Sequence, residues 1–430
     1  MMKTVSLATI LFCSFTAAIA QKTIEANPQR MEERIKALSQ YGANPEGGVS
    51  RVAYSEADIA GRKYVMGLMR NAGLEVSIDA AGNLIGKRKG KNNTLPVIAF
   101  GSHIDSVPGG GNYDGDVGSI GAIECIELMK ENNITTNHPL EVIIFQNEEG
   151  GLVGSEAISG ILTEEELSLV SSSGKTLRQG MINIGGDPTR FHEAARKKED
   201  FKAFLELHIE QGAFLDQEGF NIGVVEGIVG IKQWIVTFQG KANHAGTTPM
   251  DRRQDAMLAA AKFVVATNSI ARSIPGRQVA TNGKIKAEPG APNVIPGKVE
   301  MTLEIRDLDF EKMLTVFEKI KSAANEISEE TGVTISYSPL NEDIPAVTDK
   351  RIQDMIAASA KELGLTYKYM PSGAGHDTQD MARIAPTGMV FVPSKDGISH
   401  SPKEFTSAQD MANGASVLLQ TIMKLDKAKL

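Results

Sequence analysis

Cysteine is scarce in this sequence of 430 residues: only Cys13 and Cys125 are present. Cys13 lies in the first twenty residues, which we expect to be removed as a signal peptide. Cys125 then remains alone, which excludes an intrachain disulfide even in an oxidising compartment. Cys125 falls in the apolar helical pattern GSIGAIECIELM, which favours core packing over a role as nucleophile.

Basic blocks, internal repeats and low-complexity tracts are also absent. The chain has 45 Lys and Arg against 53 Asp and Glu, which gives a formal net charge of −8 without clustering. Neither nucleic acid nor a membrane surface is therefore an expected partner, and a small soluble substrate fits better. With 41% hydrophobic residues the chain can bury a sizeable core, and its length favours two domains.

The first twenty residues have the order of a secretory signal peptide. Met-Met-Lys precedes a mostly apolar stretch over residues 5–15, and Ala-Ile-Ala at residues 18–20 precedes Gln21. The alternative, a buried first helix, is weaker because the run is too short to span a bilayer and ends at a cleavage-like site. We therefore expect export from the bacterial cytoplasm, with the periplasm as destination.

The fold class follows from how apolar runs alternate with helical segments up to about residue 227. LPVIAFGSHID precedes a helix expected over residues 118–132, and PLEVIIFQNEEG follows it. This alternation predicts an α/β domain with a mostly parallel central sheet. Chemistry in such sheets collects at the carboxyl ends of the strands, and both runs end in acidic or His clusters.

A second domain is expected over residues 230–341, where the pattern changes to β-α-β-β-α-β. Its strands are predicted as KQWIVTFQGKA, QVATNGKIKAEP, GKVEMTLEIRDL and VTISYSP, with helices over residues 251–274 and 310–331. This order is the split unit of a ferredoxin-like domain. Because residues 342–430 resume the first pattern, the second domain is inserted into a catalytic domain made of residues 21–229 and 342–430.

The candidate metal ligands follow strands or lie in glycine-rich turns. They are His103 and Asp105 in GSHIDSV, Asp114 in GGNYDGDVG, Glu148 and Glu149 in FQNEEGG, His208 in LELHIEQG, and His400 in GISHSPKE. Such ligands suit zinc, manganese, cobalt or nickel. Each residue alone has an ordinary interpretation, as a hydrogen-bonded His, a turn Asp or a solvated Glu pair. Their joint occurrence favours a metal centre.

The chemistry of a two-metal site explains this set. Two neighbouring cations need a shared anionic bridge, which the carboxylate of Asp114 can supply. Asp105, two residues after His103, is placed to accept the proton of the second ring nitrogen and fix the tautomer. Glu148 and Glu149 are adjacent, so their side chains diverge; one can bind metal while the other acts as general base.

The chain after residue 20 resembles the M20 metallopeptidase-like superfamily, in the branch of N-carbamoyl-L-amino-acid hydrolases and allantoate amidohydrolases (hydantoinase/carbamoylase family). The motifs are GSHIDSV, the Asp114-Gly115 pair, NEEG, LELHIEQG, HAGTTPM and SGAGHDTQDMA, in that order. In the superfamily's peptidases the bridging Asp usually lies much farther from the first His, and the fourth ligand is usually a carboxylate. Here Asp114 follows His103 by 11 residues and the fourth ligand is His208, which favours the amidase branch.

The resemblance implies two divalent metal ions per subunit, with zinc or manganese favoured over cobalt or nickel. His103, Asp114 and His208 would hold one ion, and Asp114, Glu149 and His400 the other, while Glu148 would be the base. It also implies a homodimer in which the inserted lid and dimerisation domain lends a His to the other subunit. The implied substrate-binding residues are Gln211, His244, Asn293, Arg306, Gly373 and Ala374.

Two of these residues can also be assessed from their surroundings. Arg306 ends an alternating strand and offers a planar fork for a carboxylate; the alternative is a surface ion pair with Asp307 or Asp309. His244 lies in a Gly- and Thr-rich loop and could donate to a developing oxyanion; the alternative is a solvent-facing His. His376 lies in a matching loop without an assigned role.

The expected reaction is hydrolysis of the carbamoyl C–N bond of a small carboxylate-bearing ureido substrate. N-carbamoyl-L-amino acids and allantoate both fit, because both present a carboxylate and a ureido group to the same Arg and His. One alternative is a metallo-aminoacylase or dipeptidase, disfavoured by His208 and the short His-to-Asp spacing. The other is a binding protein on the same fold, which loss of a ligand or of the base would mark; none is lost.

Overall fold

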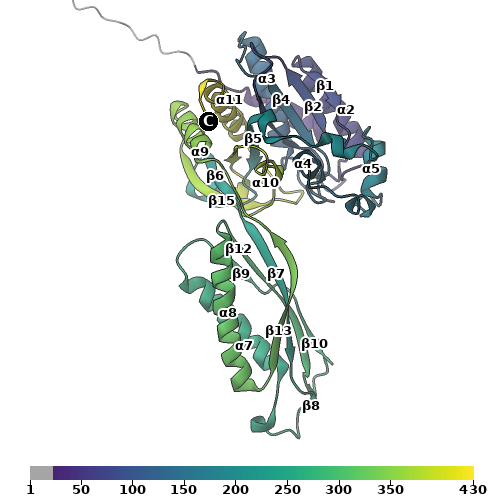
Figure 1. The fold of residues 1–430 in the computed structure, drawn as a ribbon, viewed down its shortest axis with the longest axis vertical. Helices are drawn as coiled ribbons and strands as arrows, with labels where there is room; N and C mark the ends of the chain where they lie inside the picture. Colours follow the sequence, from purple (N-terminus) through teal and green to yellow (C-terminus); the bar gives the residue numbers. More distant parts are fainter. Residues whose placement is uncertain (1–22) are drawn as a thin grey trace, which may run out of the picture.

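The computed structural model describes residues 23–430, so the predicted signal peptide and Cys13 lie outside the described residues. Figure 1 shows an α/β body above and an elongated second part below, joined where β6 and β15 approach β7 and β13. Within residues 23–430, no helix has the length and apolar character needed to cross a membrane.

Within the described residues, a nine-stranded sheet forms the centre of the upper body. Its strands are β1 (Glu75–Ile78), β2 (Leu84–Arg88), β3 (Val97–His103), β4 (Leu140–Phe145), β5 (Phe201–Ile209), β6 (Ile222–Ile228), β14 (Ala346–Val347), β15 (Tyr367–Ser372) and β16 (Thr387–Val392). They lie in the order β1-β2-β4-β3-β5-β16-β6-β14, with β15 beside β6. The central strands β4, β3, β5 and β16 pair in parallel, which confirms the α/β class with a mostly parallel central sheet.

Helices cover both faces of this sheet. They are α1 (Pro28–Leu38), α2 (Glu56–Asn71), α3 (Asp116–Glu131), α4 (Val153–Ser159), α5 (Leu177–Asn183), α6 (Phe214–Glu218), α9 (Lys350–Glu362), α10 (Asp377–Met381) and α11 (Ala408–Lys427). Alternate strand residues face opposite sides: Phe100 packs with the core under α3 and α11, and Ala99 with the core under α4 and α10. Burial on both sides explains why these strands are nearly continuous apolar runs.

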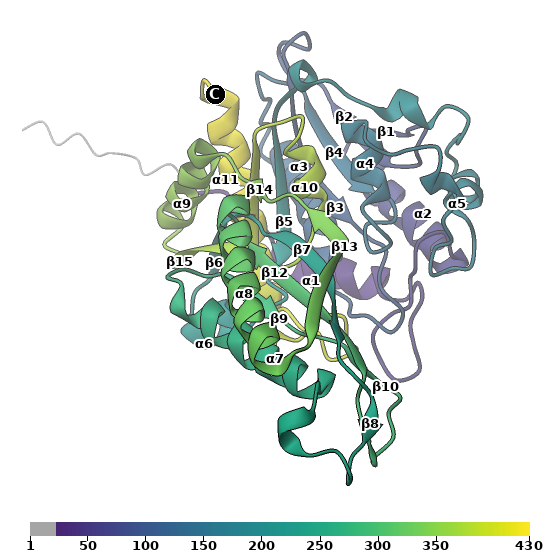
Figure 2. The same ribbon diagram turned by 60° about the horizontal axis from the view of Figure 1, so that its bottom comes forward.

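The second part is an antiparallel sheet with two helices on one face, visible along α7 and α8 in Figure 2. Its elements are β7 (Gly230–Gln239), α7 (Ala256–Ser273), β9 (Val279–Thr281), β10 (Ile285–Glu288), β12 (Lys298–Asp307), α8 (Phe310–Thr331) and β13 (Thr334–Asp343). The strand order is β10-β12-β7-β13, with β9 beside β12. Alternate residues of β12 are buried, so one face of the sheet meets the helices. Its last strand ends two residues beyond the expected boundary at 341.

The strand expected over residues 278–289 is divided into β9 and β10. Both pair with β12, and the break falls at Asn282 and Gly283. The Asn282 side-chain amide donates to the carbonyl oxygen of Thr302 at 3.1 Å, and the Lys284 amide to the Thr302 hydroxyl at 3.1 Å. These side-chain hydrogen bonds replace part of the regular ladder, as Asn and Gly favour in turns.

Candidate metal centre

The carboxyl ends of three neighbouring strands converge on one edge of the large sheet. His103 is the last residue of β3, the Glu148–Glu149 pair follows β4, and His208 lies next to the end of β5. Asp114 precedes α3 on the same edge, and His400 lies in the loop between β16 and α11. His103, Asp114 and His208 are buried, which removes competing water from the ligand atoms.

The ligand atoms form two groups that share Asp114. His103, Asp114 and His208 make one group, and Asp114, Glu149 and His400 the other, each with its ligand atoms within 4.8 Å of one another. Asp114 Oδ1 lies 3.6 Å from His103 Nε2 and 3.1 Å from His208 Nε2. Asp114 Oδ2 lies 3.3 Å from His400 Nε2. One carboxylate therefore faces both groups, as a bridging ligand requires.

Main-chain carbonyls hold the two buried imidazoles. His103 Nδ1 lies 3.0 Å from the Asp105 carbonyl oxygen, and His208 Nδ1 lies 2.9 Å from that of Ile209. A proton on each Nδ1 leaves the Nε2 lone pair facing Asp114. His103 Nε2 is buried without a hydrogen-bond partner among the described residues, as expected for an atom that binds metal.

The expected role of Asp105 needs correction at the level of atoms. Its carboxylate lies 3.8 Å from His103 Nδ1, beyond hydrogen-bonding distance, because it accepts the main-chain amides of Glu148 and Glu149 at 3.2 Å each. Asp105 thus fixes the His103 ring through its carbonyl oxygen and fixes the glutamate pair through its carboxylate.

The turn after Asp114 requires a glycine, which is Gly115. Its φ is +65°, which favours glycine, and a Cβ there would lie 2.4 Å from the His103 ring. The same residue caps the start of α3, so the tight turn brings Asp114 against His103. Any side chain at this position would push the ring out of the first group.

The closely packed ionisable groups of the centre shift one another's pKa values. Burial raises the pKa of Glu148 well above its usual range, and burial together with Asp114 raises that of Glu149 to about 7. Burial also acts to raise the pKa of Asp114, but His208, His103 and the hydrogen bond from His400 hold it well below normal. The hydrogen bond to Asp114 raises the pKa of His400 to about 9. Divalent metal ions can take the place of protons among these imidazoles and carboxylates.

Gln211 lies against the second group. Its Nε2 donates to Asp114 Oδ2 at 2.6 Å and lies 3.5 Å from His400 Nε2. Its main-chain amide donates to the Ser394 hydroxyl at 3.0 Å, which holds the residue at a positive φ of 57°. The amide side chain therefore borders the space where a substrate would meet the two groups.

Arg306 and Gly373 meet where the two parts of the chain join. Arg306 Nη1 donates to the Gly373 carbonyl oxygen at 2.9 Å, and its Nε donates to Glu304 at 2.7 Å. Among the described residues Arg306 forms no ion pair with Asp307 or Asp309; its ion pair is the one with Glu304. Lys312 instead binds the Asp307 carboxylate at 2.9 Å, and the Lys312 main-chain amide donates to Asp309. Ala374, next in the chain, donates its amide to the Ser372 hydroxyl at 3.2 Å.

His244 and Asn293 lie together, but away from the metal centre of their own chain. His244 pairs with Val294 across β8 (Asn243–His244) and β11 (Val294–Ile295), and the Ala245 amide donates to the Asn293 carbonyl at 2.9 Å. Figure 1 shows β8 at the far end of the second part. His244 is exposed, and its Nδ1 accepts the Gly246 amide at 3.0 Å, so Nε2 faces outward.

His376, for which the sequence suggests no role, packs behind His208. Their ring centroids are 4.4 Å apart, and His376 Nε2 lies 2.9 Å from the Ser372 hydroxyl. Burial lowers the pKa of His376 well below normal, with a smaller contribution from His208. The neutral ring therefore connects the end of β15 to the metal centre.

Glu404 is a site residue that the sequence analysis missed. Its Oε1 accepts the main-chain amides of Tyr113 and Asp114 at 2.9 and 3.0 Å, and its Oε2 accepts the Ser399 hydroxyl at 2.7 Å and the His400 amide at 3.3 Å. It is buried and joins the loops that carry Asp114 and His400. The only signal in the sequence is its place four residues after His400.

Glu404→Gln is expected to weaken metal binding by the group of Asp114, Glu149 and His400, by roughly 10- to 100-fold. The amide retains one acceptor oxygen but puts an NH₂ group against donors, so the two loops lose their common anchor. Titration with Zn²⁺ or Mn²⁺ against a competing chelator measures this change. Glu124→Gln, at a buried carboxylate in α3 that contacts Arg30, is the control. Unchanged affinity in Glu404→Gln would contradict the anchoring role.

The chain is similar to proteins of a known family. The model of peptidase family M20/M25/M40 matches residues 99–424. The chain belongs to this family. It is 40% identical to an N-carbamoyl-L-amino acid amidohydrolase of Geobacillus stearothermophilus, over 92% of this chain and 98% of that protein. It is 35% identical to an allantoate amidohydrolase of Bacillus subtilis, over 91% and 96%.

Among solved structures, this M20 protein resembles an amidase of the hydantoinase/carbamoylase family from Burkholderia multivorans. The TM-score is 0.87 with 33% identity, over 95% of this chain and 100% of the other. These relatives bear the names of the branch that the motifs indicate, so the expected membership is confirmed. The match extends over the second part as well as the α/β body.

Proposed function

We propose that this protein is a two-metal amidohydrolase that cleaves the carbamoyl C–N bond of N-carbamoyl-L-amino acids or allantoate. The observation that carries the proposal is the pair of ligand groups sharing Asp114, with Glu148 beside them but in neither group. The names of the relatives support the bond and the substrates. The proposed place of action is the periplasm, because residues 1–20 have the pattern of a signal peptide.

The proposed ligands are His103, Asp114 and His208 for one metal ion, and Asp114, Glu149 and His400 for the other. The mixture of imidazole and carboxylate favours zinc or manganese, with cobalt and nickel also compatible. When bound, the two ions supply Lewis acidity, which polarises the carbamoyl group and lowers the pKa of the attacking water.

Glu148 is the proposed general base. Its Oε2 lies 3.7 Å from His103 Nε2, so the carboxylate faces the first group. Glu148 is nevertheless a member of neither ligand group. It accepts a proton from the attacking water and delivers it to the departing nitrogen. Gln211 is proposed to donate its side-chain amide to the carbamoyl group; its contact with Asp114 supports this role.

Arg306 is the proposed anchor for the substrate carboxylate, beside the main chain of Gly373 and Ala374. Arg306→Lys should reduce kcat/KM by roughly 10- to 100-fold, because an ammonium cannot reproduce two parallel hydrogen bonds to a carboxylate. Ammonia release from the free acid and from its methyl ester, with both enzymes, measures the effect. The ester should be a poor substrate for wild type and no poorer for the variant. A variant that retained the full preference for the free acid would exclude this role.

The second part is proposed to act as a lid and dimerisation domain, with His244 completing the site of the partner subunit. Support comes from the position of His244 and Asn293, together at the far end of the second part. Helix α7 also exposes apolar side chains, which a monomer would leave in water: Met257, Leu258, Val264 and Val265. Across the dimer, the His244 ring would donate to the oxyanion.

An ammonia-release screen tests the function as a whole. Protein reconstituted with Zn²⁺ or Mn²⁺ is assayed with N-carbamoyl-L-amino acids, allantoate and ureidoglycolate, while N-acetyl-L-amino acids and dipeptides are followed by amine release. We expect turnover of carbamoyl substrates and loss of turnover after chelation. Turnover of only the acetyl or peptide substrates would replace the proposal with an aminoacylase or dipeptidase.

A further inference from the structure

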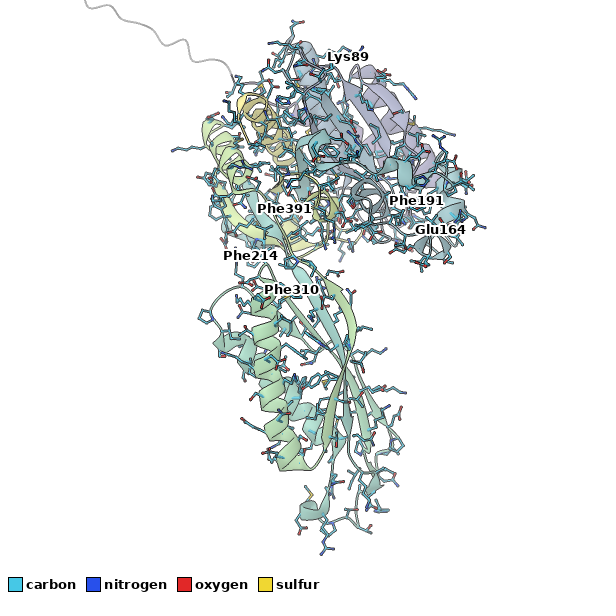
Figure 3. All side chains as sticks on the ribbon, in the orientation of Figure 1. Lys89, Glu164, Phe191, Phe214, Phe310 and Phe391 are labelled. Carbon is cyan, nitrogen blue, oxygen red and sulfur yellow. The ribbon has the colours of Figure 1, made fainter. Side chains whose placement is uncertain are left out.

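A cavity of about 430 Å³ opens where the two parts of the chain meet, with Arg306 and Gly373 in its wall. Figure 3 shows Phe214, another wall residue, at the boundary between the upper and lower parts. This volume is in the range of sites for small molecules. It is large enough for a bulky side chain beside a carboxylate.

Two chain segments connect this cavity to the metal centre. Gly373 follows Ser372, whose hydroxyl contacts His376, and His376 packs on the ligand His208. On the other side, Phe214 begins α6 only three residues after Gln211, which contacts Asp114. Arg306 is itself a wall residue, so a substrate whose carboxylate binds Arg306 would hold its α-carbon, one bond away, at this cavity.

The wall is mainly apolar. The apolar and aromatic side chains among the described wall residues are Phe214, Val229, Val279, Tyr369, Met370 and Pro371. Phe214 and Val279 are 61% and 51% exposed, so both present apolar surface that a ligand could cover. Covering such surface favours binding of apolar groups.

The charged wall residues already have partners. Arg277 binds Glu226 at 2.5 Å and Lys368 binds Glu218 at 2.5 Å, while Arg306 keeps its Nη2 free of protein acceptors within the described residues. The wall contains no Asp, Glu, Asn or Gln among its described residues. A ureido group placed there would lack side-chain acceptors for its N–H groups, apart from the Tyr369 hydroxyl, and leaving these donors unpaired is unfavourable.

We propose that this cavity receives the α-substituent of the substrate, and that the substrates are N-carbamoyl-L-amino acids with large apolar side chains. This inference rests on the proposed function and decides between its two substrate classes. The α-substituent of allantoate is a second ureido group, for which the wall offers few acceptors. The α-substituent of N-carbamoylglycine is a hydrogen atom, which would leave the apolar wall exposed to water.

The test compares kcat/KM for N-carbamoyl-L-phenylalanine, N-carbamoyl-L-leucine, N-carbamoylglycine and allantoate with metal-loaded full-length protein. We expect the phenylalanine and leucine derivatives to exceed the glycine derivative by roughly 10- to 200-fold, and to exceed allantoate by at least about tenfold. Equal or better turnover of allantoate or of the glycine derivative would overturn this inference while leaving the proposed function intact. Failure of all four would overturn the proposed function itself.

Two variants test whether the cavity causes the preference for large apolar side chains. Phe214→Ala should lower the ratio of phenylalanine to glycine derivative by about tenfold, and Val279→Asn should raise the ratio of allantoate to phenylalanine derivative, because it adds an amide acceptor. Leu169→Ala, at an apolar residue 58% exposed and outside the wall, should leave both ratios unchanged. Ratios in Phe214→Ala and Val279→Asn equal to wild type would show that the cavity does not bind the side chain.

Discussion

Glu148→Gln is expected to keep both metal ions but to lower kcat by roughly 10²- to 10⁴-fold, the usual contribution of a general base. The substitution replaces one oxygen by an amide of similar size, so the packing around His103 is retained. Because Glu148 belongs to neither ligand group, metal content should not change. Ammonia release and metal analysis of the dialysed protein measure the two effects separately.

Glu149→Gln is the matched control, since it makes the same change on the next residue. Glu149 Oε2 lies 3.5 Å from His400 Nε2 in the second ligand group, so this variant should lose one ion per subunit. Both residues receive the same support, because Asp105 accepts both main-chain amides. Equal metal content in the two variants would reverse or remove the assignment of base and ligand.

Much of the α/β body could be predicted because its strands are buried on both faces. Such strands leave continuous apolar runs, and their carboxyl ends converge wherever the sheet is parallel. His103, Glu148 and His208 lie at those ends and could be found by this rule. Asp114 was identified by its acidic turn before a helix and by the motif that it forms with Gly115.

The missed features depend on contacts that no local pattern records. Glu404 is 290 residues from Asp114, and its carboxylate reaches that loop only after β16 and α11 have packed. Asp105 could be placed beside His103 by spacing, but which of its oxygens accepts the ring proton depends on where the amides of Glu148 and Glu149 lie. The interruption between β9 and β10 likewise depends on side-chain hydrogen bonds to Thr302.

The position of His244 leads to a test of the proposed dimer. An exposed imidazole at the far end of the second part cannot donate to a substrate bound at the metal centre of the same chain in this conformation. A symmetric dimer would bring each His244 to the opposite centre, so that each site combines metals and base from one chain with an oxyanion donor from the other. His244→Ala and Glu148→Ala homodimers should then each be nearly inactive.

Unfolding the two inactive variants together and refolding them should restore activity. A mixed dimer pairs an intact Glu148 on one chain with an intact His244 on the other, which regenerates one of its two sites. Random pairing makes about half of the dimers mixed, so activity should return to about one quarter of wild type if the sites act independently. Mixing Glu148→Ala with Glu149→Gln is the control, because both residues act in the same centre and no mixed dimer contains a whole site. A His244→Ala and Glu148→Ala mixture no more active than its parents, with mixed dimers verified by mass, would show that His244 serves its own chain.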